Sequence, residues 1–218
     1  MTPFKAACDV FLLHGIHQER GKESTVGFKT LIPQAHKRDY GAILSWQALW
    51  VNRSLAETLA DEIDEHRGAL IIGHSNGCAI ASRVAELSAC VRGLVMINPA
   101  LDVDWKPPST LRWMNVYYHP NDSAVRLARW IPFTRWGAMG ATGAPPTGKT
   151  RVWNFNLASW GLGYRGISGA HNIVFQHFNF FGPLIIQHMR MRERMYESKH
   201  NYSDCADSPG SHFDGLQQ

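Results

Sequence analysis

The sequence predicts an α/β domain, with a mostly parallel central sheet and helices on both of its faces. Three observations lead to this fold class. Short apolar runs of strand length alternate with segments of helical periodicity along the chain. Several of these runs are continuously apolar, as strands buried on both faces are. The chain has 218 residues, 44% of them hydrophobic and 18% charged, which suits one large globular domain and excludes a disordered one.

The first strand is expected at Asp9–Leu13 (DVFLL), a short apolar run that ends at a His-Gly pair. A weaker run at Ala42–Trp46 is the expected second strand, and the polar stretch between the two predicts a loop with a short helix. A long helix is expected at Asn52–His66, and Gly68 ends it. Three aliphatic residues recur every four positions on one face of this helix: Leu55, Leu59 and Ile63.

The rest of the chain continues the alternation. Further strands are expected at Ala69–Ile72, Gly93–Asn98, Asn115–Tyr118 and Arg151–Leu157. Further helices are expected at Cys78–Leu87, Ala124–Ile131 and Asn172–Met195, and the last of them is expected to break at Gly182–Pro183. Residues 198–218 are polar with hardly any aliphatic side chain. We therefore expect one domain over residues 1–197 and a disordered tail over 198–218.

Composition narrows the classes of function. The net charge of +4, with no dense Lys/Arg block in the first 180 residues, argues against a nucleic-acid groove. No apolar run approaches the roughly 18 residues of a membrane span, and the N-terminus lacks the pattern of a signal peptide. The four cysteines are irregularly spaced, which favours reduced thiols over disulfides or zinc. We expect a cytoplasmic protein; the sequence leaves its oligomeric state open.

The segment Gly73-His74-Ser75-Asn76-Gly77 fits the pattern G-x-S-x-G and lies between a predicted strand and a predicted helix. In that context the serine lies on a sharp, strained turn that exposes its hydroxyl group. A side chain at Gly73 or Gly77 would collide where strand and helix run close together. The plainer interpretation is a glycine-rich turn with a capping serine. The flanking strand and helix favour Ser75 as a nucleophile.

Together with Leu12-Leu13-His14-Gly15-Ile16 after the first strand, this motif makes the chain resemble the α/β-hydrolase superfamily, over about Cys8–Met189. The resemblance implies a minimal α/β-hydrolase fold, and a nucleophile, an acid and a histidine in that order along the chain. The strands that end at Asn98 and begin at Asn115 are separated by too few residues for a helical cap domain. The resemblance also implies an oxyanion hole made by the backbone N–H of Asn76 and that of Ile16 or Gly15. No metal or organic cofactor is expected.

The acid expected from this order is Asp122, because it follows the strand Asn115–Tyr118 and precedes a helix. Asp122 could instead cap that helix. Asp102 and Asp104, which follow the strand that ends at Asn98, are the competing acids.

The base is expected after the last strand, where the glycine-rich segment Gly166–Asn172 contains His171. A histidine in such a loop can reach the serine while the acid fixes its tautomer. His177, on the following helix, is the reserve candidate. His119 precedes the acid and is in the wrong order.

The resemblance implies cleavage of a carboxylic ester through an acyl-enzyme, with an acyl ester or another small molecule as substrate. Thioesterase, lipase or amidase activity would use the same three residues, and a non-catalytic binding protein is the alternative from another class. Tryptophans predicted near the site could line an acyl pocket or belong to the core. They are Trp105, Trp113, Trp130, Trp136 and Trp160.

A second motif, Gly143–Thr150 (GAPPTGKT), matches the phosphate-loop pattern letter for letter. A working phosphate loop follows a strand and opens a helix, whereas a strand-like run follows this segment. Its two prolines also remove N–H donors that a phosphate cradle requires. We therefore expect an ordinary loop. A nucleotide-dependent enzyme that uses Lys149 is the third class of function.

Overall fold

The computed structural model describes residues 8–16, 24–38, 40, 48–66, 68–128, 130–131, 136–148, 150–166 and 168–197. In this part of the chain six strands form one sheet in the order β2-β1-β3-β4-β5-β6, and each neighbouring pair is parallel. The strands are β1 (Asp9–Leu13), β2 (His36–Arg38), β3 (Ala69–His74), β4 (Val91–Ile97), β5 (Trp113–Tyr118) and β6 (Arg151–Asn156). The predicted fold class is confirmed.

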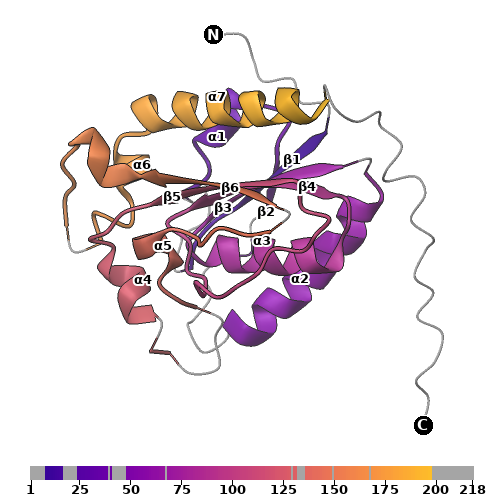
Figure 1. Cartoon of the computed structure of the whole chain (residues 1–218), viewed down its shortest axis with the longest axis horizontal. Coiled ribbons are helices and arrows are strands. Elements are labelled where there is room, and N and C mark those ends of the chain that lie inside the picture. Colours follow the sequence, from indigo (N-terminus) through magenta and orange to yellow (C-terminus); the bar gives the residue numbers. More distant parts are fainter. Residues whose placement is uncertain are drawn as a thin grey trace.

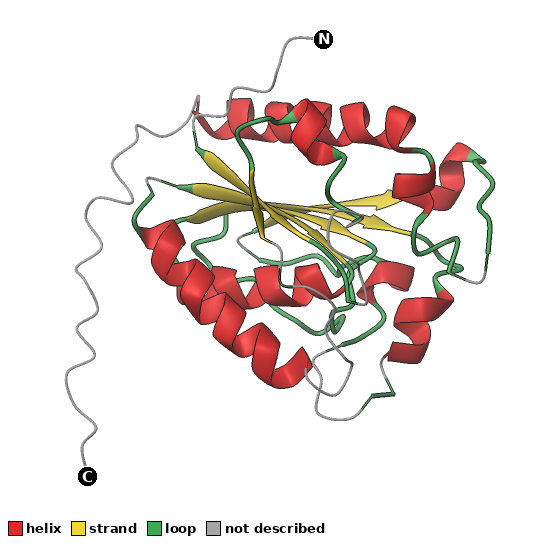
Figure 2. Ribbon diagram, turned by 180° about the vertical axis from the view of Figure 1, so that it is seen from behind, coloured by secondary structure: helices red, strands yellow, loops and turns green. Residues whose placement is uncertain are grey.

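Helices cover both faces of the sheet (Figure 1). One face carries α1 (Phe28–Leu31), α6 (Ile173–Gln176) and α7 (Phe178–Glu197), and the opposite face carries α2 (Ala48–Asp64) and α3 (Asn76–Leu87). Two shorter helices, α4 (Ser123–Ala128) and α5 (Met139–Thr142), follow β5, and a single 3-10 turn at Leu157–Trp160 follows β6. Figure 2 shows the sheet between these two helical layers. No helix among the described residues is long and apolar enough to cross a membrane.

The central strands explain why the sheet needs two helical layers. Every residue of β3 and of β4 is buried. Because successive strand residues point to opposite faces, Ile71 packs with the apolar side chains of α2 and α3, while Leu70 and Ile72 pack with those of α7. An apolar core therefore lies on each side of the sheet, as a doubly covered parallel sheet requires.

One strand lies in a stretch where the sequence predicts none. The apolar run at Ala42–Trp46 lies outside the described residues, and the strand beside β1 is β2, in the stretch predicted to be a loop. β2 is an edge strand with three half-buried polar residues, so it has no apolar pattern. Polar contacts hold it instead: Arg38 pairs with Glu62 of α2, and His36 pairs with Asp9.

The predicted break at Gly182–Pro183 is also wrong. The chain bends at His177, between α6 and α7, and α7 continues through Pro183. A proline here removes the N–H that would pair with the carbonyl of Asn179. Asn179 is exposed, so water can bond to that carbonyl and the helix continues. The tail predicted for residues 198–218 lies outside the described residues.

Candidate active site

Ser75 occupies a sharp turn between β3 and α3. Its backbone has φ 53° and ψ −119°, a conformation that non-glycine residues rarely adopt and that often marks functional sites. The turn is tight because α3 starts against the end of β1. A Cβ on Gly77 would lie 2.4 Å from the carbonyl oxygen of Leu13, and one on Gly73 would lie 3.0 Å from the backbone of Cys78. Both glycines are therefore required by close backbone approach, as the sequence predicted.

The turn lies at the point where the sheet reverses its winding. From β1 the chain passes to β2 on one side and later to β3 on the other, so β1 and β3 are neighbours. Open parallel sheets bind ligands at the carboxyl ends of two such strands. Gly15 follows β1 and Ser75 follows β3, and a Cβ on Gly15 would lie 3.2 Å from the Cβ of Ser75. The His-Gly segment therefore lies directly against the serine.

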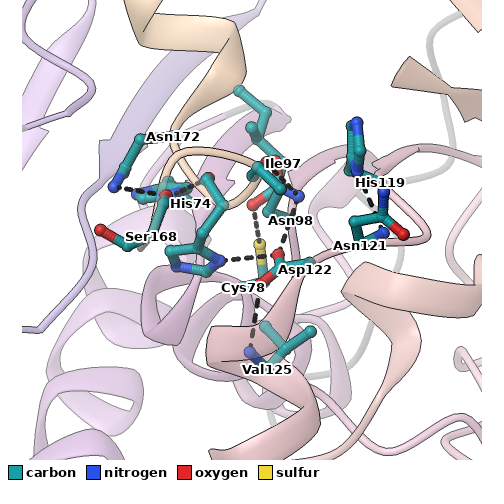
Figure 3. Close-up of polar contacts among 12 residues, drawn as sticks. His74, Cys78, Ile97, Asn98, His119, Asn121, Asp122, Val125, Ser168 and Asn172 are labelled. Atoms are coloured by element: carbon teal, nitrogen blue, oxygen red, sulfur yellow. Dashed lines mark hydrogen bonds and ion pairs between the residues drawn. The ribbon is translucent and has the colours of Figure 1, made fainter. Parts of the chain in front are cut away.

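His171 and Asp122, which are 49 positions apart in the sequence, meet at this edge of the sheet. The His171 Nδ1 lies 2.7 Å from the Oδ2 of Asp122. The Asp122 side chain is fully buried, and Asn98 donates its amide Nδ2–H to the same Oδ2 at 2.9 Å. The backbone N–H of Val125 donates to Oδ1 at 3.2 Å. Figure 3 shows Asp122 between Asn98 and Val125.

This arrangement answers the question whether Asp122 caps a helix or pairs with a histidine. It does both: one oxygen accepts from Val125, in the first turn of α4, and the other accepts from His171 and Asn98. Asn98 follows β4 with φ 43°, a left-handed conformation that asparagine tolerates. Asn98 is a site residue that could not be expected from the sequence, because its only signal is its position at the carboxyl end of a buried strand.

A cavity of about 380 Å³ lies above the carboxyl ends of the central strands, within the range of ligand pockets. The predicted nucleophile, base and oxyanion residues all line it: Ser75, His171, Gly15, Ile16 and Asn76. Most of the remaining wall is apolar, with small side chains and one tryptophan. These residues are Ala100, Ala124, Val125, Ala128 and Trp136.

The competing candidates have other partners. Asp102 and Asp104 are exposed, and the Oδ1 of Asp102 accepts from the backbone N–H of Asp104. His177 bonds through Nε2 to the carbonyl of Gly163 at 2.6 Å. His119 is buried but its Nδ1 accepts from the backbone N–H of Asn121. None of these four side chains is among the described residues that line the cavity.

The structure also identifies a buried residue that sequence reasoning missed, His74, at a variable position of the serine motif. Its Nε2 lies 3.3 Å from the carbonyl oxygen of His171, and its Nδ1 lies 2.7 Å from the Oγ of Ser24. A carbonyl can only accept, so Nε2 carries the proton and Nδ1 accepts from the serine hydroxyl. Burial, and then the nearby imidazole of His171, hold the pKa of His74 well below its ordinary value.

His74 predicts a pH dependence of stability. Because its pKa is lowered in the folded chain, the unfolded chain binds a proton near pH 6.5 that the folded chain does not. The resulting stability is complete above pH 6.5 and is lost as the pH falls below it, by up to about 1.4 kcal/mol for each pH unit. In thermal melts at pH 7.5 and 5.5, we expect His74→Gln to lose less stability on acidification than wild type. An equal loss in both proteins would contradict this.

Only one of the five tryptophans predicted near the site, Trp136, lines the cavity. Trp113 and Trp105 are buried, and each donates its indole N–H to a glutamate. Trp160 packs edge-on against a phenylalanine of α7, and Trp130 is 73% exposed. Trp113 begins β5, so it lies at the end of the strand opposite to the site.

The segment that matches a phosphate loop precedes a strand rather than a helix. Residues 143–148 connect α5 to β6, and Asn154 of β6 bonds to both the N–H and the carbonyl of Ala144. This confirms the expectation of a loop; Lys149 itself lies outside the described residues. The described part of the chain contains no group of three His, Cys, Asp or Glu side chains that could hold a metal ion.

Comparisons with known proteins identify a family for this chain. The model of the alpha/beta hydrolase family matches residues 13–188. A solved structure from Pectobacterium atrosepticum, described as a YdeN-like hydrolase, is 14% identical with a TM-score of 0.46, and the match covers 86% of this chain and 91% of that one. A hydrolase of the alpha/beta superfamily from Xanthomonas campestris is 12% identical with a TM-score of 0.44, over 79% and 99% of the two chains. The comparison with curated proteins finds no match.

Proposed function

The chain belongs to the alpha/beta hydrolase family, and from this we propose that it is a serine hydrolase that cleaves carboxylic esters through an acyl-enzyme intermediate. Ser75 is the nucleophile, His171 the general base and Asp122 the acid that orients it. The observation that carries the proposal is the 2.7 Å contact between His171 and Asp122 at the rim of the cavity that Ser75 lines. A buried carboxylate is bonded to an imidazole that lines the same cavity as a strained serine, and these are the groups that activate a hydroxyl group in serine hydrolysis.

The reaction has two halves. His171 removes the proton of Ser75 as the Oγ attacks the ester carbonyl, and then protonates the departing alcohol, which leaves an acyl group on Ser75. His171 next removes a proton from water, the hydroxide adds to the acyl carbonyl, and the carboxylic acid leaves as Ser75 regains its proton. Asp122 accepts from Nδ1 throughout, so Nε2 is the nitrogen that exchanges protons, and the carboxylate stabilises the imidazolium formed in each half.

The backbone supplies the oxyanion hole. Asn76 is the first residue of α3, so its N–H has no acceptor within the helix. This N–H lies at the N-terminus of the helix, which is the positive end of the helix dipole. The N–H of Ile16, or of Gly15, is the second donor, since this segment follows β1 directly against Ser75. Such preorganised donors contribute about 3 to 4 kcal/mol each to transition-state stabilisation.

The cavity wall favours an apolar acyl group. Ala124 and Ala128 are one helical turn apart on α4 and both line the cavity. We expect Ala128→Phe to fill part of this space and to lower kcat/KM for p-nitrophenyl octanoate by about tenfold. This factor corresponds to the loss of burial of one to two methylene groups of the acyl chain. Cleavage of p-nitrophenyl acetate should be unchanged. Leu127→Phe is the control, because Leu127 is 69% exposed. Equal losses on both esters would contradict an acyl pocket at this wall.

Turnover of a chain-length series of p-nitrophenyl esters by the wild-type protein tests the proposal itself. Matched thioesters and anilides in the same assay separate ester hydrolysis from thioesterase and amidase activity. Hydrolysis of the esters, with saturation, is the expected result. A protein that is folded but cleaves no member of any series would contradict the proposed function.

A further inference from the structure

The side chain of Asn76 is bonded in a way that the mechanism above does not require. Its Oδ1 accepts from the Nδ2 of Asn52 at 2.7 Å and from the indole Nε1 of Trp136 at 2.9 Å. Its own Nδ2 donates back to the Oδ1 of Asn52 at 2.9 Å. The two amides thus form a reciprocal pair, and the indole N–H adds a third bond. Both lone pairs of the Asn76 oxygen are used.

These three residues come from separate parts of the fold. Asn52 lies in the first part of α2, Asn76 begins α3, and Trp136 lies in the segment before α5. Asn76 is fully buried and Trp136 is 6% exposed, so water competes little for these bonds. Trp136 also lines the cavity together with Ser75 and His171. The bonds therefore join the residue after the nucleophile to a second helix and to the cavity wall.

We propose that Asn52 and Trp136 are positioning residues that hold the backbone N–H of Asn76 at the oxyanion; the inference rests on the proposed function. Only two rotatable bonds separate the Asn76 amide from its Cα. A planar amide fixed by three hydrogen bonds therefore restricts where the backbone of this residue can lie. Oxyanion donors act because they are oriented before the reaction, and a misplacement of about 1 Å can cost about 100-fold in rate.

The packing of α2 on α3 indicates that these bonds are not what joins the two helices. Apolar side chains of both helices meet in the core below, among them Ile63 and Ala60 from α2 and Val84 and Ala81 from α3. The amide pair lies at the opposite end of the contact, beside the catalytic serine. Losing the pair leaves the buried Nδ2 of Asn76 without this acceptor, but it keeps the apolar contacts between the two helices. Loss of the pair should therefore affect the rate more than the fold.

Three variants and one inhibitor test this. Asn52→Leu removes the amide pair at similar volume, and Trp136→Phe keeps an aromatic wall but removes the indole donor. Asn154→Leu is the matched control, because Asn154 also makes two bonds through a side-chain amide, in its case to the backbone of Ala144. The readouts are kcat and KM for p-nitrophenyl butyrate, the Ki of an alkyl trifluoromethyl ketone, and the thermal midpoint. This ketone forms a tetrahedral adduct whose oxygen occupies the oxyanion hole.

We expect Asn52→Leu to lower kcat by about 10- to 100-fold with KM changed less than about threefold, and Trp136→Phe to lower it less. The Ki of the ketone should rise by the factor by which kcat/KM falls. Asn154→Leu should lower the thermal midpoint and leave kcat and Ki unchanged. Wild-type kcat and Ki in both site variants would overturn the inference, as would a lower kcat with an unchanged Ki. A wild-type protein that neither cleaves the ester nor binds the ketone would instead overturn the proposed function.

Discussion

Replacing Ser75 with alanine is expected to lower kcat for ester hydrolysis by about 10⁴- to 10⁶-fold. Without the Oγ no acyl-enzyme can form, and the remaining groups can only polarise the ester and orient water. The loss is large because the three residues act as a unit. Removing the nucleophile alone costs nearly as much activity as removing all three. The measurement is p-nitrophenyl butyrate turnover at high enzyme concentration, with background hydrolysis subtracted.

The control for this variant is a second buried serine on the neighbouring helix. Ser82 of α3 is 1% exposed and donates its hydroxyl to the carbonyl of Ala79. Ser82→Ala loses one hydrogen bond, worth about 1 kcal/mol, and should retain wild-type kcat. Activity of Ser75→Ala within tenfold of wild type would exclude Ser75 as the nucleophile.

Asp122→Asn is expected to lower kcat by about 10³- to 10⁴-fold. Both carboxylate oxygens accept hydrogen bonds: Oδ2 from His171 and Asn98, and Oδ1 from Val125. An amide at this position must direct its NH₂ group at one of these donors. If the NH₂ group faces His171 and Asn98, His171 is held in the wrong tautomer. If the NH₂ group faces Val125, the buried N–H of Val125 loses its acceptor. In both orientations the negative charge that stabilises the imidazolium is gone.

The same substitution carries a cost in stability, because one buried donor is left unsatisfied. We expect a loss of about 1 to 3 kcal/mol in the free energy of unfolding, measured by denaturant titration. Asp104→Asn is the matched control, since Asp104 is exposed and is, with Asp102, one of the two competing acids. It should leave kcat and stability unchanged. If Asp104→Asn reduced kcat and Asp122→Asn did not, the assignment of the acid would be wrong.

The order of the elements could be predicted from the sequence because the central strands are mostly apolar. β3 and β4 are buried along their length, so their composition alone separates them from the amphipathic helices between them. The serine motif could be located because its glycines are required by backbone contacts that any such turn makes. Asp122 and His171 were expected from order along the chain. The structure brings them into contact, and their catalytic roles are proposals.

Features that depend on contacts between distant residues could not be predicted. β2 is a polar edge strand held by polar contacts, which leave no periodic apolar pattern to detect. Asn98 and Asn52 are single asparagines whose importance lies in one partner each, 24 positions away. His74 stands at a variable position of its motif, and only its burial distinguishes it from a surface histidine. Many combinations of residues and positions can make such a polar contact, so no sequence pattern predicts it.

The central claim is that Ser75 is an activated nucleophile, and covalent labelling tests it most directly. Intact mass after exposure to a fluorophosphonate should show one adduct on the wild-type protein, with the modified peptide containing Ser75, and none on Ser75→Ala. Asp122→Asn should label far more slowly than wild type. A folded wild-type protein that gains no adduct, or an adduct that persists in Ser75→Ala, would contradict the account.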